Sequence, residues 1–139
     1  MKKILIYSFI SIMFFFLYSC NKEKNSYFNA KKSNTVQELK KFVVNFPDGT
    51  YADSARQLIE KLVWDSVTKE NSLKIYQAYV MEHTPGKYTD SAKVLLDNML
   101  WQSAKNSNTA DDYEVFIDEY PDSKYIDSAK ILFDKLKVK

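Results

Sequence analysis

The feature that most constrains the fold of this 139-residue chain is an internal repeat that returns every 37 residues. The segment YPDSKYIDSAK at 120–130 has a close counterpart, FPDGTYADSAR, at 46–56 and a looser one, HTPGKYTDSAK, at 83–93. A fixed period of about 20 to 50 residues is typical of proteins in which each unit buries its apolar face only against its neighbours. We therefore expect one repeat domain at 27–139, with units at about 27–63, 64–100 and 101–139.

Equivalent positions of the three copies match in chemical character without any insertion. Asparagines recur at Asn34, Asn71 and Asn108, and an Asp-Ser-Ala step begins at residues 53, 90 and 127. Aromatic and small side chains that return at the repeat period are typical of packing between helices. The residues that we expect to pack the repeats are Trp64, Trp101, Tyr51, Tyr88, Tyr125, Ala55, Ala92 and Ala129.

Within one unit the apolar residues follow a helical spacing twice. In the third unit they step by three or four along 110–120, which is one stripe of a short helix. Thr35, Ser72 and Thr109 precede this helix in the three copies, and their hydroxyls can accept hydrogen bonds from its first turn. In the first two units no breaker interrupts the second helix before about residues 69 and 106. The sequence therefore predicts an all-α fold of helix-turn-helix repeats.

The turn between the two helices of each unit contains all the prolines and glycines of the chain. Pro47, Pro85 and Pro121 cannot continue a helix. Gly49 and Gly86 can adopt a positive φ angle, which would let them end the first helix in the first two units. We therefore expect these glycines to supply the left-handed conformation that reverses the chain.

The first residues read as an export signal. Lys2 and Lys3 precede a mainly apolar run at 4–17, which would span only about 21 Å as a helix and is shorter than a bilayer core of about 30 Å. Cys20 is the only cysteine of the chain, so it has no partner for an internal disulfide. We predict a signal peptide at 1–19, lipid modification of Cys20 and a polar tether at 20–26.

Composition argues against several classes of function. The chain has 20 basic and 18 acidic residues, so cleavage of the signal with its two lysines leaves a net charge of zero, which is not the charge of a nucleic-acid binder. His83 is the only histidine, and its equivalents Phe46 and Tyr120 mark it as a packing position at a helix end. No catalytic residue, metal site or cofactor is expected, because neither a triad nor a set of metal ligands can be assembled.

The residues LYSC at 17–20 resemble the lipobox of bacterial lipoproteins, in which the cysteine carries the lipid. The repeat, with Tyr113 and Phe116 before YPDSKYIDSAK and Leu132 after it, resembles the tetratricopeptide-like repeats of bacterial envelope lipoproteins, above all the outer-membrane assembly lipoproteins of the BamD (YfiO) type. The resemblance covers about residues 27–137 and implies a short right-handed solenoid. Two departures are the period of 37 in place of the usual 34 and the absence of the small glycine in the first helix.

What the resemblance implies is a non-enzymatic adaptor or scaffold, held in the cell envelope by a lipid on Cys20, that binds a protein partner. Asn21 is not the aspartate that resembles an inner-membrane retention mark, so the outer membrane is preferred. Membership of an outer-membrane assembly machinery is one alternative, and a carbohydrate-binding or hydrolytic lipoprotein that uses the repeated aromatics is another. Candidate partner-binding residues on the first helices of the units are Lys40, Lys41, Gln77 and Glu114.

Overall fold

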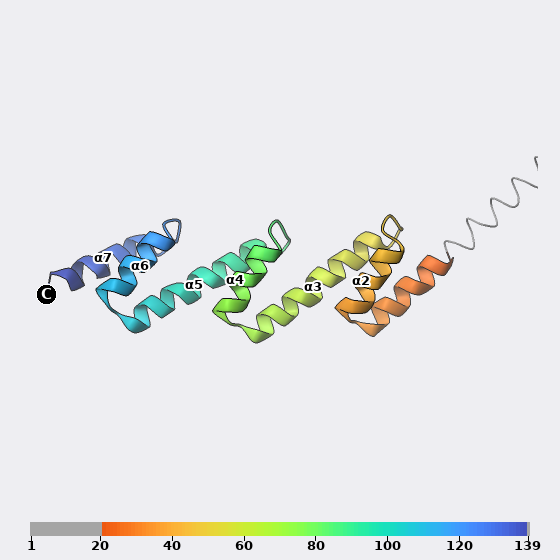
Figure 1. Cartoon of the computed structure of the whole chain (residues 1–139), viewed down its shortest axis with the longest axis horizontal. Coiled ribbons are helices and arrows are strands. Elements are labelled where there is room, and N and C mark those ends of the chain that lie inside the picture. Colours follow the sequence, from red (N-terminus) through yellow and green to blue (C-terminus); the bar gives the residue numbers. More distant parts are fainter. Residues whose placement is uncertain (1–20, 139) are drawn as a thin grey trace, which may run out of the picture. The chain divides into compact units, whose positions relative to one another are not determined.

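The computed structural model describes residues 21–138, and every regular element among them is a helix (Figure 1). Residues 21–33 are helical, and the helices that follow are α2 (Val36–Asn45), α3 (Ala52–Glu70), α4 (Leu73–Glu82), α5 (Thr89–Ser107), α6 (Ala110–Glu119) and α7 (Ile126–Lys137). The predicted all-α class is confirmed. The predicted ends of the second helices, near residues 69 and 106, fall within one residue of the observed ends of α3 and α5.

Three short helices begin at the predicted hydroxyl residues. The side chains of Thr35, Ser72 and Thr109 accept hydrogen bonds from the backbone N–H groups of Glu38, Ile75 and Asp112, at the starts of α2, α4 and α6. Each of these bonds satisfies one of the N–H groups that have no partner within the helix. The sequence therefore specifies where the first helix of each unit begins.

Among residues 21–138 the left-handed residues are asparagines, and the prediction that the glycines would supply this conformation is wrong. Asn34, Asn71 and Asn108 have φ angles of 52°, 44° and 51°, and neither Gly49 nor Gly86 has a positive φ. Asparagine tolerates this region because its short polar side chain can bond locally. The hydroxyls of Tyr76 and Tyr113 donate to the side-chain oxygens of Asn71 and Asn108, each at 3.1 Å. These left-handed residues therefore lie inside each repeat unit, where the preceding helix ends and the short helix α2, α4 or α6 begins.

The described residues form two compact units, which are larger than the repeat units of the sequence and are divided between Ser66 and Val67. In the first unit, the helical residues 21–33, α2 and the start of α3 enclose a core of Tyr27, Ala30, Leu39, Phe42 and Ala55. Leu39 and Ala55 are completely buried. Partly buried side chains complete this core: Val43, Phe46, Tyr51, Leu58, Ile59 and Leu62.

The second unit contains a core built from the same repeat positions. Its buried members are Trp101, Ala104, Tyr113, Phe116 and Ala129, each 74 residues beyond a member of the first core. Every partly buried member also has its counterpart 74 residues on, and Leu100 is the one addition. In this unit α4 packs against α5, and α6 packs against both α5 and α7. The same set of packed positions therefore recurs 74 residues later, which is twice the period of the sequence repeat.

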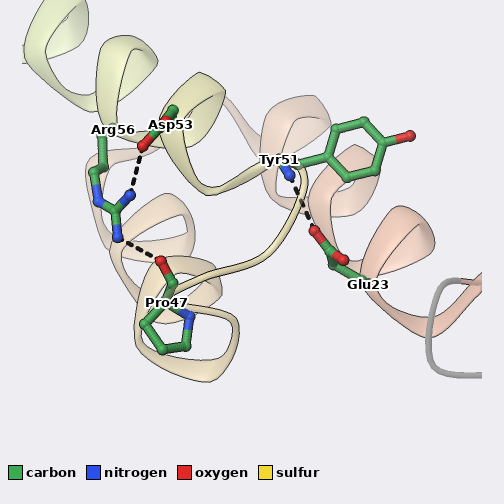
Figure 2. A network of polar contacts seen from close by, with 5 residues as sticks. All are labelled: Glu23, Pro47, Tyr51, Asp53 and Arg56. Atoms are coloured by element: carbon green, nitrogen blue, oxygen red, sulfur yellow. Dashed lines mark hydrogen bonds and ion pairs between the residues drawn. The ribbon is translucent and has the colours of Figure 1, made fainter. Parts of the chain in front are cut away.

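The structure describes the segment predicted as a polar tether from residue 21 onwards. Residues 21–26 are helical and continue into the helix that carries Tyr27. The carboxylate of Glu23 accepts a hydrogen bond of 3.0 Å from the backbone N–H of Tyr51, just before α3 begins (Figure 2). Glu23 provides the acceptor for a backbone N–H group at the start of α3. Residues 21–26 are therefore tied to the fold, although they lack an apolar period. The predicted signal and Cys20 lie outside the described residues.

Candidate interaction surfaces

All the residues predicted to pack the repeats are buried or partly buried in the structure. Ala55, Ala92 and Ala129 are completely buried. Tyr27 stacks on Tyr51 with ring centroids 4.7 Å apart and planes inclined by 14°. Trp101 stacks on Tyr125 in the same way, at 5.2 Å and 11°. Trp64 and Tyr88 are partly buried.

His83 lies at the end of α4 and packs as the repeat position suggested. Its ring stacks on Tyr79 with centroids 4.6 Å apart. Its backbone carbonyl accepts a hydrogen bond of 2.8 Å from the hydroxyl of Thr89, the first residue of α5. At the equivalent ends of α2 and α6, Phe46 packs on Phe42 and Tyr120 on Phe116. An aromatic ring therefore closes each short helix.

The four candidate partner-binding residues differ in how far their side chains are engaged. Lys40 and Lys41 are exposed on α2. Gln77 hydrogen-bonds the side chain of Tyr120, and Glu114 forms a 3.6 Å ion pair with Lys137 of α7. Neither of the two grooves described below is lined by any of them. Lys40 and Lys41 belong to the first compact unit, and Gln77 and Glu114 belong to the second.

The hydroxyl of Tyr120, at the end of α6, has a pKa raised above the ordinary tyrosine value. Burial raises the pKa of the Tyr120 hydroxyl, and the negative charge of Glu119 beside it and a hydrogen bond to that carboxylate raise the pKa further. The hydrogen bond to Gln77 acts in the opposite direction. The neutral phenol is therefore favoured in the folded chain.

A network of polar contacts holds the turn that leads into α3 (Figure 2). The guanidinium of Arg56 forms an ion pair with Asp53 at 2.7 Å and donates to the backbone carbonyl of Pro47 at 2.6 Å. Glu23 reaches the same turn from the helical residues 21–33. Asp53 also lies in the first turn of α3, where a carboxylate interacts favourably with the helix dipole. Each of these contacts fixes the turn, and none of them assembles a catalytic group.

The first groove lies between α5 and the turn that joins α6 to α7, and it has a volume of about 480 Å³. Leu96, Leu100 and Tyr120 contribute apolar surface, and Val94 at its edge is 52% exposed. Charged residues of both signs also line it: Lys93, Asp97, Glu119, Asp122 and Lys124. Because charges of both signs surround the apolar surface, the groove favours neither an anionic nor a cationic ligand.

The second groove lies along α5, has a volume of about 500 Å³ and is lined by uncharged residues only. The beginning of α4 and the connection before it contribute Leu73 and Asn71. The lining residues of α5 are Leu95, Asn98, Met99, Gln102, Ser103 and Asn106. The sequence analysis missed this groove, although its signal was visible: amide side chains recur every four residues at 98, 102 and 106. We name these three residues the amide row.

The acidic side chains of α6, among them Asp111, Asp112, Glu114 and Asp118, are exposed on the helix surface. Across residues 21–138, no group of three or more histidine, cysteine or carboxylate side chains could hold a metal ion.

Comparison with known proteins gives no relative from which a role could be transferred: no family model, curated protein or solved structure matches this chain. Within residues 21–138, none of the helices has the length and apolar character needed to cross a bilayer.

Proposed function

We propose that this chain is a lipid-anchored adaptor of a bacterial cell envelope, built from three tetratricopeptide-like helix pairs in a short right-handed solenoid. Its role is to bind a protein partner, and it is not an enzyme. Outer-membrane attachment through Cys20 is the preferred location.

The observation that carries this proposal is the recurrence of one core at repeat positions. Tyr27 stacks on Tyr51, and Trp101 stacks on Tyr125 74 residues later, with the neighbouring core positions also conserved in kind between the two clusters. Repeated helix pairs bury their apolar faces against adjacent pairs and leave long polar surfaces for partners. Recurrence of both sequence and packing supports a repeat scaffold over an irregular helical domain.

The chemistry of the side chains also supports binding over catalysis. The only histidine is stacked on Tyr79 at a helix end. The repeated aromatics that a sugar platform would need are largely internal, since Trp101 is 7% exposed and stacked on Tyr125. Large apolar side chains nevertheless remain at the surface of the short helices, where Val44 is 78% and Met81 85% exposed. Such side chains are available to a macromolecular partner.

The anchor is supported by the sequence LYSC at 17–20 and by the absence of a second cysteine. A lipidated cysteine holds a protein firmly when it carries two or more acyl chains, whereas one chain gives only marginal binding. Residues 21–33, which follow Cys20 in the sequence, are helical, so the lipid would lie close to the first repeat.

The experiment that tests the anchor is metabolic labelling with radioactive palmitate, followed by membrane fractionation. Wild-type chain is expected to incorporate label and to sediment with the membranes, and Cys20→Ala is expected to lose both properties. Ser19→Ala, one residue away, serves as the matched control and is expected to behave as wild type. Membrane retention of Cys20→Ala without label would contradict the lipid anchor.

The adaptor role is tested separately by crosslinking in living cells. A photoreactive residue at the exposed position Lys40 or Met81 is expected to give a discrete crosslinked product with another envelope protein. Identification of the product distinguishes a general adaptor from a component of outer-membrane assembly, for which the product would be a β-barrel insertase. Lack of any discrete product from several surface positions would argue against an adaptor.

A further inference from the structure

The groove along α5 has two parallel rows of side chains on the same helix. Leu95, Met99 and Ser103 form one row, and the amide row of Asn98, Gln102 and Asn106 forms the other. Within each row the residues are four apart and therefore share a face of the helix. None of the residues that line this groove is charged or aromatic, although 27% of the chain is charged.

Two tyrosine hydroxyls set the orientation of amides in this groove. Tyr125 donates to the side-chain oxygen of Asn98 at 2.8 Å, and Tyr76 donates to that of Asn71 at 3.1 Å. With the oxygen of each amide engaged in this way, its NH₂ group retains two donors for another molecule. Asn71 and Asn98 therefore present oriented hydrogen-bond donors in the groove, and a carbonyl oxygen is an acceptor that fits them.

The spacing of the amide row matches an extended peptide. Residues four apart on an α-helix are about 6 Å apart along its axis. Carbonyl groups that point to the same side of an extended chain lie two residues, or about 6.6 Å, apart. Over the three members of the row the mismatch is about 1 Å, which flexible side chains such as that of Gln102 can absorb.

The fold itself does not require amides at these positions. In α3 the residues 37 positions earlier are Lys61, Asp65 and Lys69, and Lys61 forms a 2.6 Å ion pair with Asp65. The same helical positions therefore accept charges that satisfy one another in one copy of the repeat. In α5 they carry neutral amides: Asn98 accepts a hydrogen bond from Tyr125, whereas Gln102 and Asn106 are exposed and can donate to a ligand.

We propose that the groove along α5 binds an uncharged, extended peptide segment, with the amide row donating hydrogen bonds to alternate backbone carbonyls and the row of Leu95 and Met99 contacting its apolar side chains. This inference rests on the proposed function, because it names the site and the chemical class of an adaptor's partner. A sugar fits the groove less well, since stacking aromatics are absent from its lining.

The test is a titration of the ¹⁵N-labelled full chain in detergent micelles with a capped hexapeptide of alternating serine and leucine. Saturable shifts are expected for the side-chain NH₂ resonances of Asn71, Asn98 and Gln102. The double variant Gln102→Asp with Asn106→Lys copies charges that α3 already carries, so it is expected to fold. It is expected to bind the peptide about tenfold more weakly, because neutral donors are lost.

The matched control is Gln102→Asn with Asn106→Gln, which keeps both amides and changes only the side-chain lengths. It is expected to bind within about threefold of the wild type. Shifts that map elsewhere, equal binding by the charged double variant, or no saturable binding at millimolar peptide would each overturn the proposal. Palmitate labelling measures lipid attachment at Cys20, and this titration measures peptide binding in the groove. The two proposals can therefore fail independently.

Discussion

The hydroxyl of Tyr113 donates a 3.1 Å hydrogen bond to the side-chain oxygen of Asn108, the residue that ends α5 in a left-handed conformation. Tyr76 makes the same bond to Asn71 at the same distance. In the first copy Leu39 takes the place of the tyrosine, and Asn34 keeps its positive φ without such a bond. The backbone conformation is therefore the conserved feature of the three reversals, and the tyrosine bond is an addition in two of them.

Two replacements of Asn108 distinguish the energetic cost of its positive φ angle from the contribution of its hydrogen bond to Tyr113. Asn108→Ala is expected to lower the free energy of unfolding by about 2 kcal/mol, because alanine is strained at positive φ and the Tyr113 hydroxyl also loses its partner. Asn108→Gly is expected to cost about 1 kcal/mol or less, since glycine adopts this conformation freely. Chemical denaturation followed by circular dichroism measures both. Equal losses for the two variants would show that backbone strain is not the determining term.

At Gly49 a side chain is expected to be disfavoured for a steric reason and not because of the φ angle, since the Glu23 carboxylate would have to move away from the N–H of Tyr51. A Cβ atom on Gly49 would meet Cδ of Glu23 at 2.8 Å and Cβ of Phe46 at 3.2 Å. Gly49→Ala is therefore expected to destabilise the chain, although alanine at an unstrained position normally adds about 0.4 to 1 kcal/mol. In a Glu23→Ala background the same change is expected to become neutral or favourable.

A double-mutant cycle of Glu23 and Gly49, read from denaturant midpoints, provides the measurement. A loss of stability from Gly49→Ala that is unchanged by removal of Glu23 would show that the clash does not involve this carboxylate. Asp53→Ala is a suitable control, because it alters the same turn through an exposed ion pair with Arg56 worth at most about 1 kcal/mol.

Trp101 distinguishes internal packing from a ligand-binding platform. It is buried, and it stacks on Tyr125 and contacts Phe116 at 5.5 Å between ring centroids. Trp101→Ala is expected to lower the free energy of unfolding by about 3 to 5 kcal/mol, and Trp101→Phe by much less. Thermal unfolding checks both variants. Near wild-type stability in Trp101→Ala, together with lost binding to a glycan array, would instead favour the carbohydrate-binding alternative.

Much of the local fold follows from the sequence because its signals are short in range. The hydroxyl caps at Thr35, Ser72 and Thr109 act within one turn, and all three begin a helix as predicted. The periodic apolar stripes likewise identify buried residues such as Leu39 and Phe116. These features depend on neighbours three or four residues away, which a repeat presents three times over.

Other features depended on contacts that a one-dimensional pattern does not show. Glycine was the default choice for positive φ, but the reversals fall at asparagines that two tyrosines then engage. The polar residues 21–26 lacked an apolar period, yet Glu23 binds the turn before α3 from 28 residues away. Among the candidate binding residues, Gln77 and Glu114 proved to have partners of their own on α6 and α7.

The stability of the chain at alkaline pH is expected to depend on Tyr120. Its pKa is raised in the folded chain, first by burial and then by Glu119, so the folded state holds the phenolic proton more tightly than the unfolded state does. This contribution to stability is fully present below the ordinary tyrosine pKa of about 10 and is lost as the pH rises through the higher folded-state value. Stability should therefore fall in that window more steeply for the wild type than for Tyr120→Phe.

Denaturant midpoints measured between neutral pH and the alkaline range provide the test, with Tyr125→Phe as the comparison. The Tyr125 ring stacks on Trp101, and its hydroxyl donates to the neutral amide of Asn98. The expected result is that removal of the Tyr120 hydroxyl flattens the alkaline slope, while removal of the Tyr125 hydroxyl lowers stability at neutral pH through loss of its bond to Asn98. Parallel slopes in the wild type and Tyr120→Phe would mean that neither burial nor Glu119 raises the pKa of this phenol in the folded chain.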